Sequence, residues 1–196
     1  MDGVTLALTE LNNKPVAAAT VERNSVDVAK AVETLMAAAP EAIVQISAYK
    51  SCAAFIRAAR KAGYGGRFFN VSFVGTQALA DELGKDGAGI VVSQVVPSPY
   101  TQARPITREF TEAVRKSGGQ VTANFSSMEG YLAAKVLAEG IRRAGGKTNR
   151  EALITGLEGI SNQSFGGFQV NFSSTDHVAS SFVELSMLTG DGRVRT

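Results

Sequence analysis

Residues 42–73, AIVQISAYKSCAAFIRAARKAGYGGRFFNVSF, hold two apolar runs of strand length that flank a segment with helical periodicity. The runs are 42–48 and 68–73, and both have the length of buried strands. Glycines follow the central segment at 63–66, where a helix would end. Two strands joined by such a helix form a parallel pair with a right-handed crossover. The apolar positions of the helix recur on one face, and they are Cys52, Phe55, Ile56 and Ala59.

The same alternation of strand and helix continues on both sides of this stretch. Upstream, the sequence predicts the tail of a helix at 4–12, a strand at 15–21 and an amphipathic helix from Val28 to Ala39. Downstream, it predicts a short helix at 76–83 and a fourth strand at 90–96. Alternating elements of these lengths predict an α/β fold built on a parallel sheet.

The pattern changes after this fourth strand. The sequence Val96-Pro97-Ser98-Pro99-Tyr100 predicts a stiff, extended connection, because each proline restricts the residue before it. Three helical segments follow, with no convincing long strand among them. They are expected at 105–117, 126–144 and 149–159.

Strand character returns near the carboxyl end of the chain. Residues 168–172 alternate between apolar and polar side chains, and 182–188 form another apolar run. We therefore expect two parts. Residues 1–96 and 165–196 would form one α/β lobe, and 97–164 would form a hinge with additional helices.

The composition argues against several classes of function. The 196 residues carry a net charge of +2 with no basic cluster, so we expect no nucleic-acid partner. The single cysteine, Cys52, excludes an internal disulfide and a cysteine-based zinc site, and we interpret it as a small buried hydrophobe. The single histidine, His177, lies in a polar loop, and its isolation removes most metal and Ser-His-Asp chemistry.

No part of the sequence combines a nucleophile, a base and an oxyanion donor. The glycines at 63–66 lie between a helix and the next strand, whereas dinucleotide loops lie between a strand and the following helix. They therefore indicate the end of a helix. We expect no catalytic residue, no metal site, no cofactor and no enzymatic activity.

Three residues follow predicted strands at the edge where α/β proteins bind ligands. Tyr49 comes after the strand at 42–48, while Ser72 and Phe73 close the next strand. Ligands of parallel α/β proteins lie outside the carboxyl ends of the strands. Each residue therefore has two interpretations: contact with a ligand, or local capping of the core. Position alone does not separate them.

Four longer stretches are similar to the Leu/Ile/Val-binding branch of the type I periplasmic binding proteins. Residues 16–69 resemble the second lobe of the family, including a tyrosine after the A-I-V strand. FVGTQALADELGKDGAGIVVSQVVPSP, at 73–99, resembles the following helix, strand and hinge. SSMEGYLAAKVLAEGIRRAG, at 126–145, is similar to the long helix after the hinge, and FGGFQVNFSSTDHVASSFVEL, at 165–185, to the closing strands.

The resemblance implies a fold, a ligand and a partner. The fold would be a three-layer α/β lobe with an appended helical segment that normally belongs to the other lobe. In this family two lobes close on a small ligand, an amino acid or an aromatic or aliphatic carboxylate, and an ABC permease receives the loaded protein. The parent protein would be periplasmic or lipid-anchored outside the cell, and no signal peptide is expected in this chain.

The resemblance also assigns ligand-binding residues. Tyr49 matches the tyrosine of the second lobe that faces the ligand. Ser72 or Phe73 falls where some relatives place an acidic residue against the ammonium group of an amino acid. Phe125 falls near an aromatic residue of the cleft, just after the hinge. Because neither Ser72 nor Phe73 is anionic, a ligand without an amine fits this site equally well.

Finally, the resemblance implies that the first lobe is absent, so that the helices within 105–160 would lose their cover. Exposed apolar surface costs about 25 cal/mol per Å². We therefore expect self-association through these helices. The side chains expected to be uncovered are Ile106, Phe110, Val114, Leu132 and Val136.

Taken together, these observations favour the substrate-binding component of an ABC-type uptake system, present as a partial chain. Two other readings stay open at this point. One is a ligand-sensing regulatory domain of the same fold, and the other is a truncated fragment that no longer binds a ligand.

Overall fold

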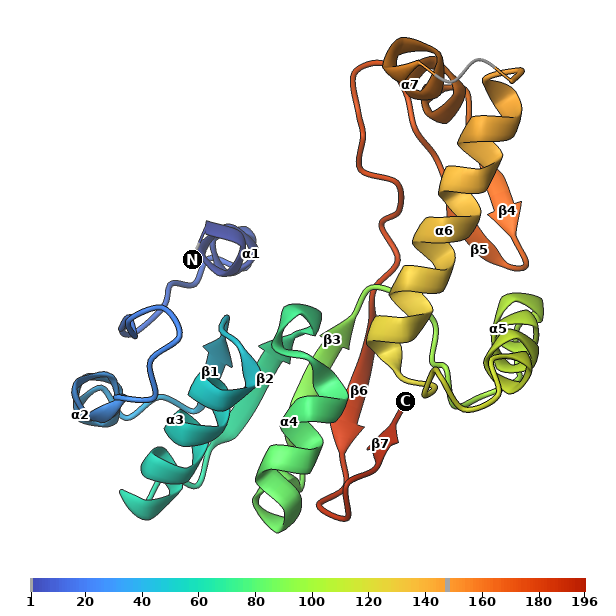
Figure 1. The fold of residues 1–196 in the computed structure, drawn as a ribbon. Coiled ribbons are helices and arrows are strands. Elements are labelled where there is room, and N and C mark those ends of the chain that lie inside the picture. Colours follow the sequence, from blue (N-terminus) through green and yellow to red (C-terminus); the bar gives the residue numbers. More distant parts are fainter. Residues whose placement is uncertain (1, 147–148) are drawn as a thin grey trace. The chain divides into compact units, whose positions relative to one another are not determined.

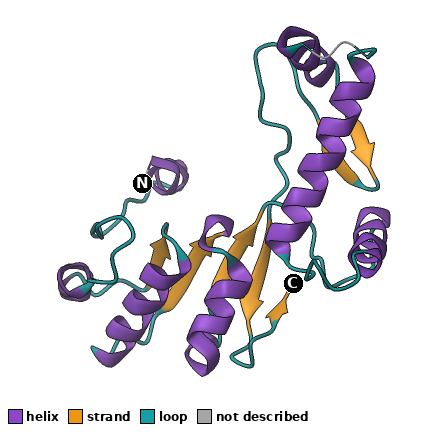
Figure 2. Cartoon of the chain, viewed as in Figure 1, coloured by secondary structure: helices purple, strands orange, loops and turns teal. Residues whose placement is uncertain are grey.

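The computed structural model describes residues 2–146 and 149–196, which form two compact units. The first unit contains the residues up to Ser93 together with Leu185–Thr196, and the second contains Gln94–Glu184. Figure 1 traces the path of the chain, and Figure 2 shows the helices and strands of both units. The chain thus leaves the first unit after its third strand and returns to it for the last two.

A five-stranded sheet forms the centre of the first unit, in the order β1-β2-β3-β6-β7. β2 pairs in parallel with β1 and with β3, whereas β6 and β7 are antiparallel. The parallel pairs confirm the α/β class that the alternation of short strands and helices predicts. The strands are Ala42–Gln45 (β1), Arg67–Val71 (β2), Val91–Gln94 (β3), Glu184–Leu188 (β6) and Val194–Arg195 (β7).

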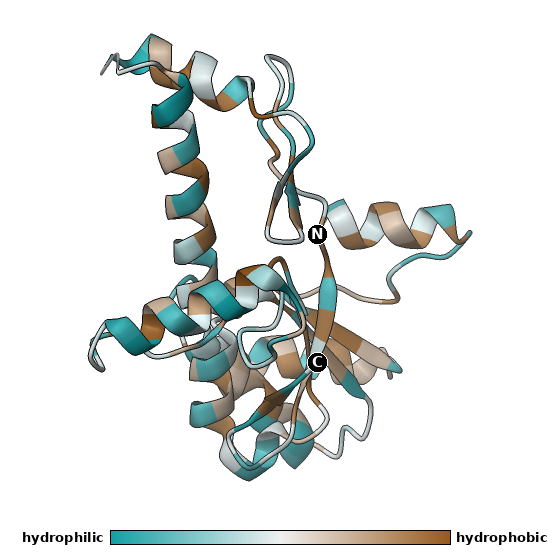
Figure 3. Ribbon diagram, turned by 90° about the vertical axis from the view of Figure 1, so that its right-hand side faces the viewer, coloured by the Kyte–Doolittle hydropathy of each residue, from teal (hydrophilic) through white to brown (hydrophobic). Residues whose placement is uncertain are grey.

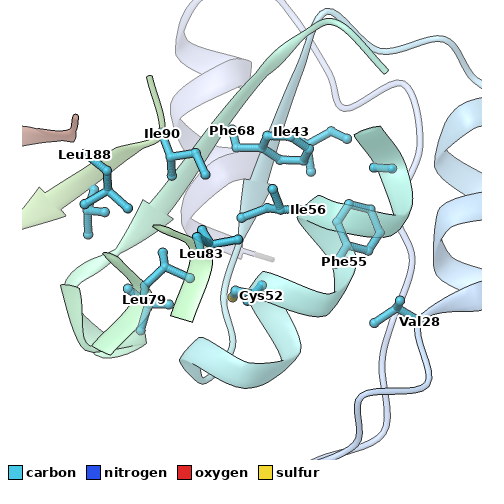
Figure 4. Close-up of a cluster of buried hydrophobic side chains, with 14 of the residues drawn as sticks. Val28, Ile43, Cys52, Phe55, Ile56, Phe68, Leu79, Leu83, Ile90 and Leu188 are labelled. Carbon is cyan, nitrogen blue, oxygen red and sulfur yellow. The ribbon is translucent and has the colours of Figure 1, made fainter. Parts of the chain in front are cut away.

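Helices α3 and α4 lie against one face of this sheet (Figure 1). Ile43 of β1 and Phe68 of β2 are buried there and form one cluster with Phe55 and Ile56 of α3 (Figure 4). Cys52 belongs to the same cluster, which confirms its interpretation as a buried hydrophobe. The helical elements of this unit are Asp2–Glu10 (α1), Ala29–Ala37 (α2), Tyr49–Lys61 (α3), Ser72–Val74 (η1), Thr76–Leu83 (α4) and Gly84–Gly87 (η2).

The opposite face of the sheet is more exposed. The strands are largely apolar (Figure 3), and residues that point away from the buried cluster keep much of their surface accessible. Val44, Leu185 and Met187 are 45%, 59% and 45% exposed, and α1 contributes no buried residue. The core of the first unit is therefore concentrated on the face that α3 and α4 cover.

The second unit has a core of its own. Phe110 of α5 packs against Tyr131 of α6, with 5.5 Å between the ring centroids. Phe168 and Val170 of β5 are buried as well. The elements of this unit are Pro105–Lys116 (α5), Phe125–Arg143 (α6), Arg150–Glu158 (α7), Gln163–Phe165 (β4) and Phe168–Val170 (β5).

The expected exposure of the helices of the second unit is wrong for three residues. Ile106, Phe110 and Leu132 are each at most 3% exposed, because α5, α6 and the β4–β5 hairpin pack on one another. Val114 and Val136 are half-buried. The three buried side chains therefore give no support for self-association through these helices, which stays a prediction.

Residues 165–184 belong to the second unit, whereas the sequence-based division grouped 165–196 with the first lobe. The cause is the β4–β5 hairpin, whose turn residues Gly166 and Gly167 have φ angles of +59° and +91°. Glycine adopts such angles without strain, which suits a two-residue hairpin turn. The amide of Ile106 donates to the carbonyl of Gly166 at 3.0 Å, so the hairpin is fixed to α5.

Two other elements differ from expectation. Residues 15–21 form no strand, although the sequence predicts one, and β4 and β7 form where no strand was predicted. β7 is a two-residue strand that pairs with β6 after a turn, and pairs this short leave little pattern in the sequence.

Helices α6 and α7 approach each other closely at two glycines. A Cβ atom on Gly156 would lie well inside contact distance of the carbonyl oxygen of Gly140 and 3.1 Å from the amide nitrogen of Ala144. A Cβ atom on Gly140 would lie 2.5 Å from Cδ2 of Leu157. Backbone atoms cannot move aside as a flexible side chain can, so this crossing requires glycine at 156.

We expect Gly156→Ala to destabilise the protein by roughly 1–3 kcal/mol, because the added methyl group forces the two helices apart. Gly130→Ala is the matched control: Gly130 is an exposed residue of α6 with no atom near the position of its Cβ. This substitution should stabilise the protein by up to about 1 kcal/mol, since alanine is the better helix former. Urea unfolding followed by circular dichroism measures both changes, and equal effects of the two substitutions would contradict the close crossing.

Candidate ligand-binding site

The carboxyl ends of β1 and β2 meet at one edge of the sheet and bring together three of the four predicted ligand-binding residues. The two strands are parallel and in register, with Gln45 opposite Asn70. Tyr49 is the first residue of α3 and directly follows the three-residue loop, 46–48, that leaves β1. Ser72 and Phe73 form η1 directly after β2. Parallel pairing therefore places all three at the same edge.

The surroundings of Tyr49 are compatible with both of its interpretations, local capping of the core and contact with a ligand. Its ring is half-buried and packs against the core cluster, as a capping residue would. The Nζ atom of Lys50 lies 5.9 Å from the centroid of the ring, so a cation approaches one side of it. The remaining accessible surface leaves room for contact with a ligand.

Phe73 is 72% exposed, which makes it the most accessible of the three. The η1 turn ends at Gly75, whose φ of +78° is in the left-handed region that favours glycine. This turn directs the chain from β2 into α4 and leaves the ring of Phe73 on the surface. An aromatic ring that exposes most of its area at this edge can stack on a flat or apolar ligand.

The two helices that begin at this edge leave their first turns open to an anion. Neither α3 nor α4 has a side-chain N-cap, and neither has an acidic residue in its first turn. The first amide groups of a helix carry partial positive charge and have no partner within the helix. Carboxylates and phosphates are stabilised at such positions.

Two polar residues of this edge whose side chains have buried atoms were not predicted from the sequence. Oε1 of Gln45 and both terminal atoms of the Asn70 side chain are buried and have no hydrogen-bond partner among the described residues. Unpaired buried polar atoms are costly and uncommon. The available signal was a polar residue within each apolar run, at AIVQIS and FFNVSF. Both residues lie at the carboxyl ends of their strands.

Phe125 lies in the second unit, at the start of α6. The ring is 3% exposed and packs edge-to-face on Tyr100, with 5.7 Å between the centroids. Tyr100 follows the two prolines of the connection and keeps 42% of its surface. Within this unit Tyr100 therefore has an accessible aromatic ring, and the buried ring of Phe125 packs against it. Contact of Phe125 with a ligand stays a prediction.

The titratable groups of the described residues show no catalytic arrangement. His177 lies on the surface, where Nε2 is 3.0 Å from Oε1 of Glu158. Burial raises the pKa of the Cys52 thiol to about 11 and so disfavours the thiolate. Among the residues that the structure describes, no three His, Cys, Asp or Glu side chains are grouped to hold a metal ion, and none of the helices is long and apolar enough to cross a membrane.

Known proteins share this architecture over almost the whole chain. The model of the periplasmic binding protein family matches residues 1–192. The structure of a substrate-binding periplasmic protein from Ralstonia solanacearum is similar at 32% identity with a TM-score of 0.87, over 98% of this chain and 56% of that one. A possible leucine/isoleucine/valine-binding protein from Rhodopirellula baltica SH 1 is similar at 30% identity with a TM-score of 0.84, over 89% and 48% of the two chains.

The chain belongs to the periplasmic binding protein family. This confirms the resemblance to the Leu/Ile/Val-binding branch. A branched-chain amino acid ABC transporter protein from Thermus thermophilus, solved with bound valine, shares the fold at 21% identity with a TM-score of 0.77, over 97% and 53% of the two chains. The chain spans about half the length of these solved structures, and no curated protein matches the sequence.

Burial raises the pKa of Glu129, which lies on α6 one turn after Phe125. A raised carboxyl pKa means that the folded state holds its proton to higher pH than the unfolded state. The free energy of unfolding therefore falls as pH rises from the ordinary pKa of glutamate to the raised one, and the penalty persists above both.

We expect Glu129→Gln to raise the free energy of unfolding at pH 7, because the amide carries no charge to desolvate. The gain should shrink toward zero at about pH 4, where the carboxyl group is largely protonated in both states. Urea titrations at both values measure it. Glu151→Gln, an exposed residue of α7, is the matched control and should change stability by less than about 0.5 kcal/mol. A gain of equal size at the two pH values would contradict the role of burial.

Proposed function

We propose that this chain is part of the substrate-binding component of an ABC-type uptake system and that its ligand is a small carboxylate. The observation that carries the proposal is the edge formed by β1 and β2, where two uncapped helix N-termini accompany an exposed Phe73 and a half-buried Tyr49. Membership of a family of solute-binding proteins supports a role in binding and transport rather than in catalysis.

The roles of the residues follow from their chemistry. The amide groups at the start of α3 and α4 would attract the carboxylate of the ligand. Phe73 would cover its apolar part, and Tyr49 would add its ring or its hydroxyl group. Ser72, half-buried beside Phe73, would donate its hydroxyl hydrogen. Phe125 would act from the second unit. The bound protein would then deliver the ligand to a permease at the outer face of the membrane.

The absence of a negative charge among the four predicted residues narrows the ligand class. An ammonium group that leaves water without a counter-charge is strongly disfavoured. A carboxylate that carries an apolar group and no amine fits the predicted residues without this cost. We therefore assign aliphatic or aromatic carboxylates as the preferred ligands and free amino acids as the weaker ones.

Isovalerate and L-valine have the same branched side chain and differ in the amine, so they test this assignment directly. We expect isovalerate to bind at least as tightly as L-valine in isothermal titration calorimetry, with 3-phenylpropanoate and L-phenylalanine as the aromatic pair. Phe73→Ala should weaken carboxylate binding by about ten-fold, the loss of roughly 1.4 kcal/mol of apolar contact. Leu11→Ala is the control, because Leu11 is as exposed as Phe73 and lies far from Phe73 in the sequence. Tighter binding of both amino acids would show that an anionic partner for the ammonium group exists.

A further inference from the structure

Lys50 is the second residue of α3 and belongs to the edge at which the candidate ligand-binding site lies. α3 begins at Tyr49, directly after the loop that leaves β1. The side chain of Lys50 is exposed, and its Nζ atom lies 5.9 Å from the centroid of the Tyr49 ring. A cation within about 6 Å of a ring centroid is attracted by the π electrons of the ring. The ammonium group of Lys50 is therefore held beside Tyr49.

The position of Lys50 within α3 is electrostatically unfavourable. The first turn of a helix carries partial positive charge, so cations stabilise the opposite end. α3 follows this rule at its carboxyl end, where Arg60 and Lys61 lie in the last turn. Its first turn has the reverse arrangement, with Lys50 and no acidic residue. Lys50 thus adds positive charge to the end of the helix that is already positive.

No acidic side chain of the edge offsets this charge. Residues 45–51 and 70–77, which leave β1 and β2 and begin α3 and α4, contain a single charged residue, Lys50. Among residues 2–146 and 149–196, no carboxylate forms an ion pair with it. The two segments that form the edge therefore carry one positive charge and no negative one.

Asn70 provides a second, independent observation at the same edge. Phe68 and Asn70 are two residues apart on β2, so both side chains point to the face that α3 and α4 cover. Asn70 is 2% exposed, and neither terminal atom of its side chain has a hydrogen-bond partner among the described residues. The edge thus combines an unsatisfied polar side chain with an unbalanced charge. Features that cost stability and occur together are expected at a functional site.

We propose that Lys50 is a specificity-determining residue of the candidate site, and that its ammonium group selects ligands with a carboxylate over uncharged ligands of the same shape. This inference deepens the proposed function and rests on it. The open amides of α3 favour any hydrogen-bond acceptor, whereas a full positive charge distinguishes a carboxylate from a neutral amide. Lys50 would act on the charged end of the ligand, while Phe73 and Tyr49 contact its apolar part.

Isovalerate and isovaleramide have nearly the same shape and differ in the charge of one group, and 3-phenylpropanoate and 3-phenylpropanamide form an aromatic pair. Isothermal titration calorimetry on the intact chain measures all of these compounds. Because Lys50 is exposed, we expect an effect of the size of an exposed ion pair, so that Lys50→Gln weakens binding of both carboxylates by roughly three-fold. Binding of the two amides should not change measurably. In about 1 M sodium chloride the selective loss should disappear, because salt screens exposed charges.

Two further variants serve as controls. Lys50→Arg keeps the positive charge and should bind the carboxylates as the unsubstituted chain does. Lys61→Gln removes the same charge at the other end of α3, roughly 16 Å away along the helix axis, and should leave binding of all the compounds unchanged. Urea unfolding adds a second readout. Lys50→Gln should raise the midpoint or leave it unchanged, whereas Lys61→Gln should lower it, because the two ends of a helix have opposite partial charges.

Loss of carboxylate affinity in Lys50→Gln, with amide binding and stability retained, supports the assignment. Unchanged carboxylate binding in this variant would overturn it, as would an equal loss for carboxylates and amides with a lower urea midpoint, which would indicate a structural role. Equal weakening by Lys61→Gln would overturn it as well, since the effect would then be one of net charge. If the unsubstituted chain binds neither carboxylate, the proposed function is wrong and this inference fails with it.

Discussion

The parallel pairing of β2 with β1 on one side and with β3 on the other is the constraint on which the first unit depends. Parallel strands cannot be joined by a tight turn, so each connection must cross the sheet and return as a helix. α3 and α4 are these connections, and their apolar faces meet Ile43 and Phe68 in one buried cluster. The same pairing brings the carboxyl ends of β1 and β2 to one edge. The candidate site is thus a consequence of strand direction.

Two features of this edge cost stability. Burial of Gln45 and Asn70 within the sheet leaves polar atoms unpaired, which costs stability. Exposure of Phe73 leaves an aromatic ring in water, which gives up the gain from its burial. A unit selected for stability alone would avoid both arrangements. Their occurrence at the end where α/β folds bind ligands agrees with a site in which stability has been exchanged for recognition.

The second unit shows how a helical segment can satisfy its own apolar surface. Pairing of Phe110 with Tyr131, contact of the hairpin turn with α5 and the close crossing at Gly156 bury residues that the sequence pattern could only mark as apolar. The first unit, by contrast, keeps Val44, Leu185 and Met187 accessible on one face of its sheet. Exposed apolar surface therefore lies on the sheet of the first unit and also on α6 and α7, where Leu137, Ile141 and Ile154 are 45%, 52% and 38% exposed.

The sequence by itself determined the α/β class, the parallel order of the first strands, the start of α3 at Tyr49 and the buried state of Cys52, because periodicity and strand length report local structure directly. It also marked Tyr49, Ser72 and Phe73 as residues of the carboxyl edge, since position relative to a strand is a local property. Only the tertiary structure decided that 15–21 forms no strand, that the β4–β5 hairpin joins the second unit, and that Phe125 packs edge-to-face on Tyr100. A strand forms only when another backbone meets its hydrogen-bonding groups, and burial depends on which elements pack together. Both are relations between segments distant in the sequence, and no local pattern contains them.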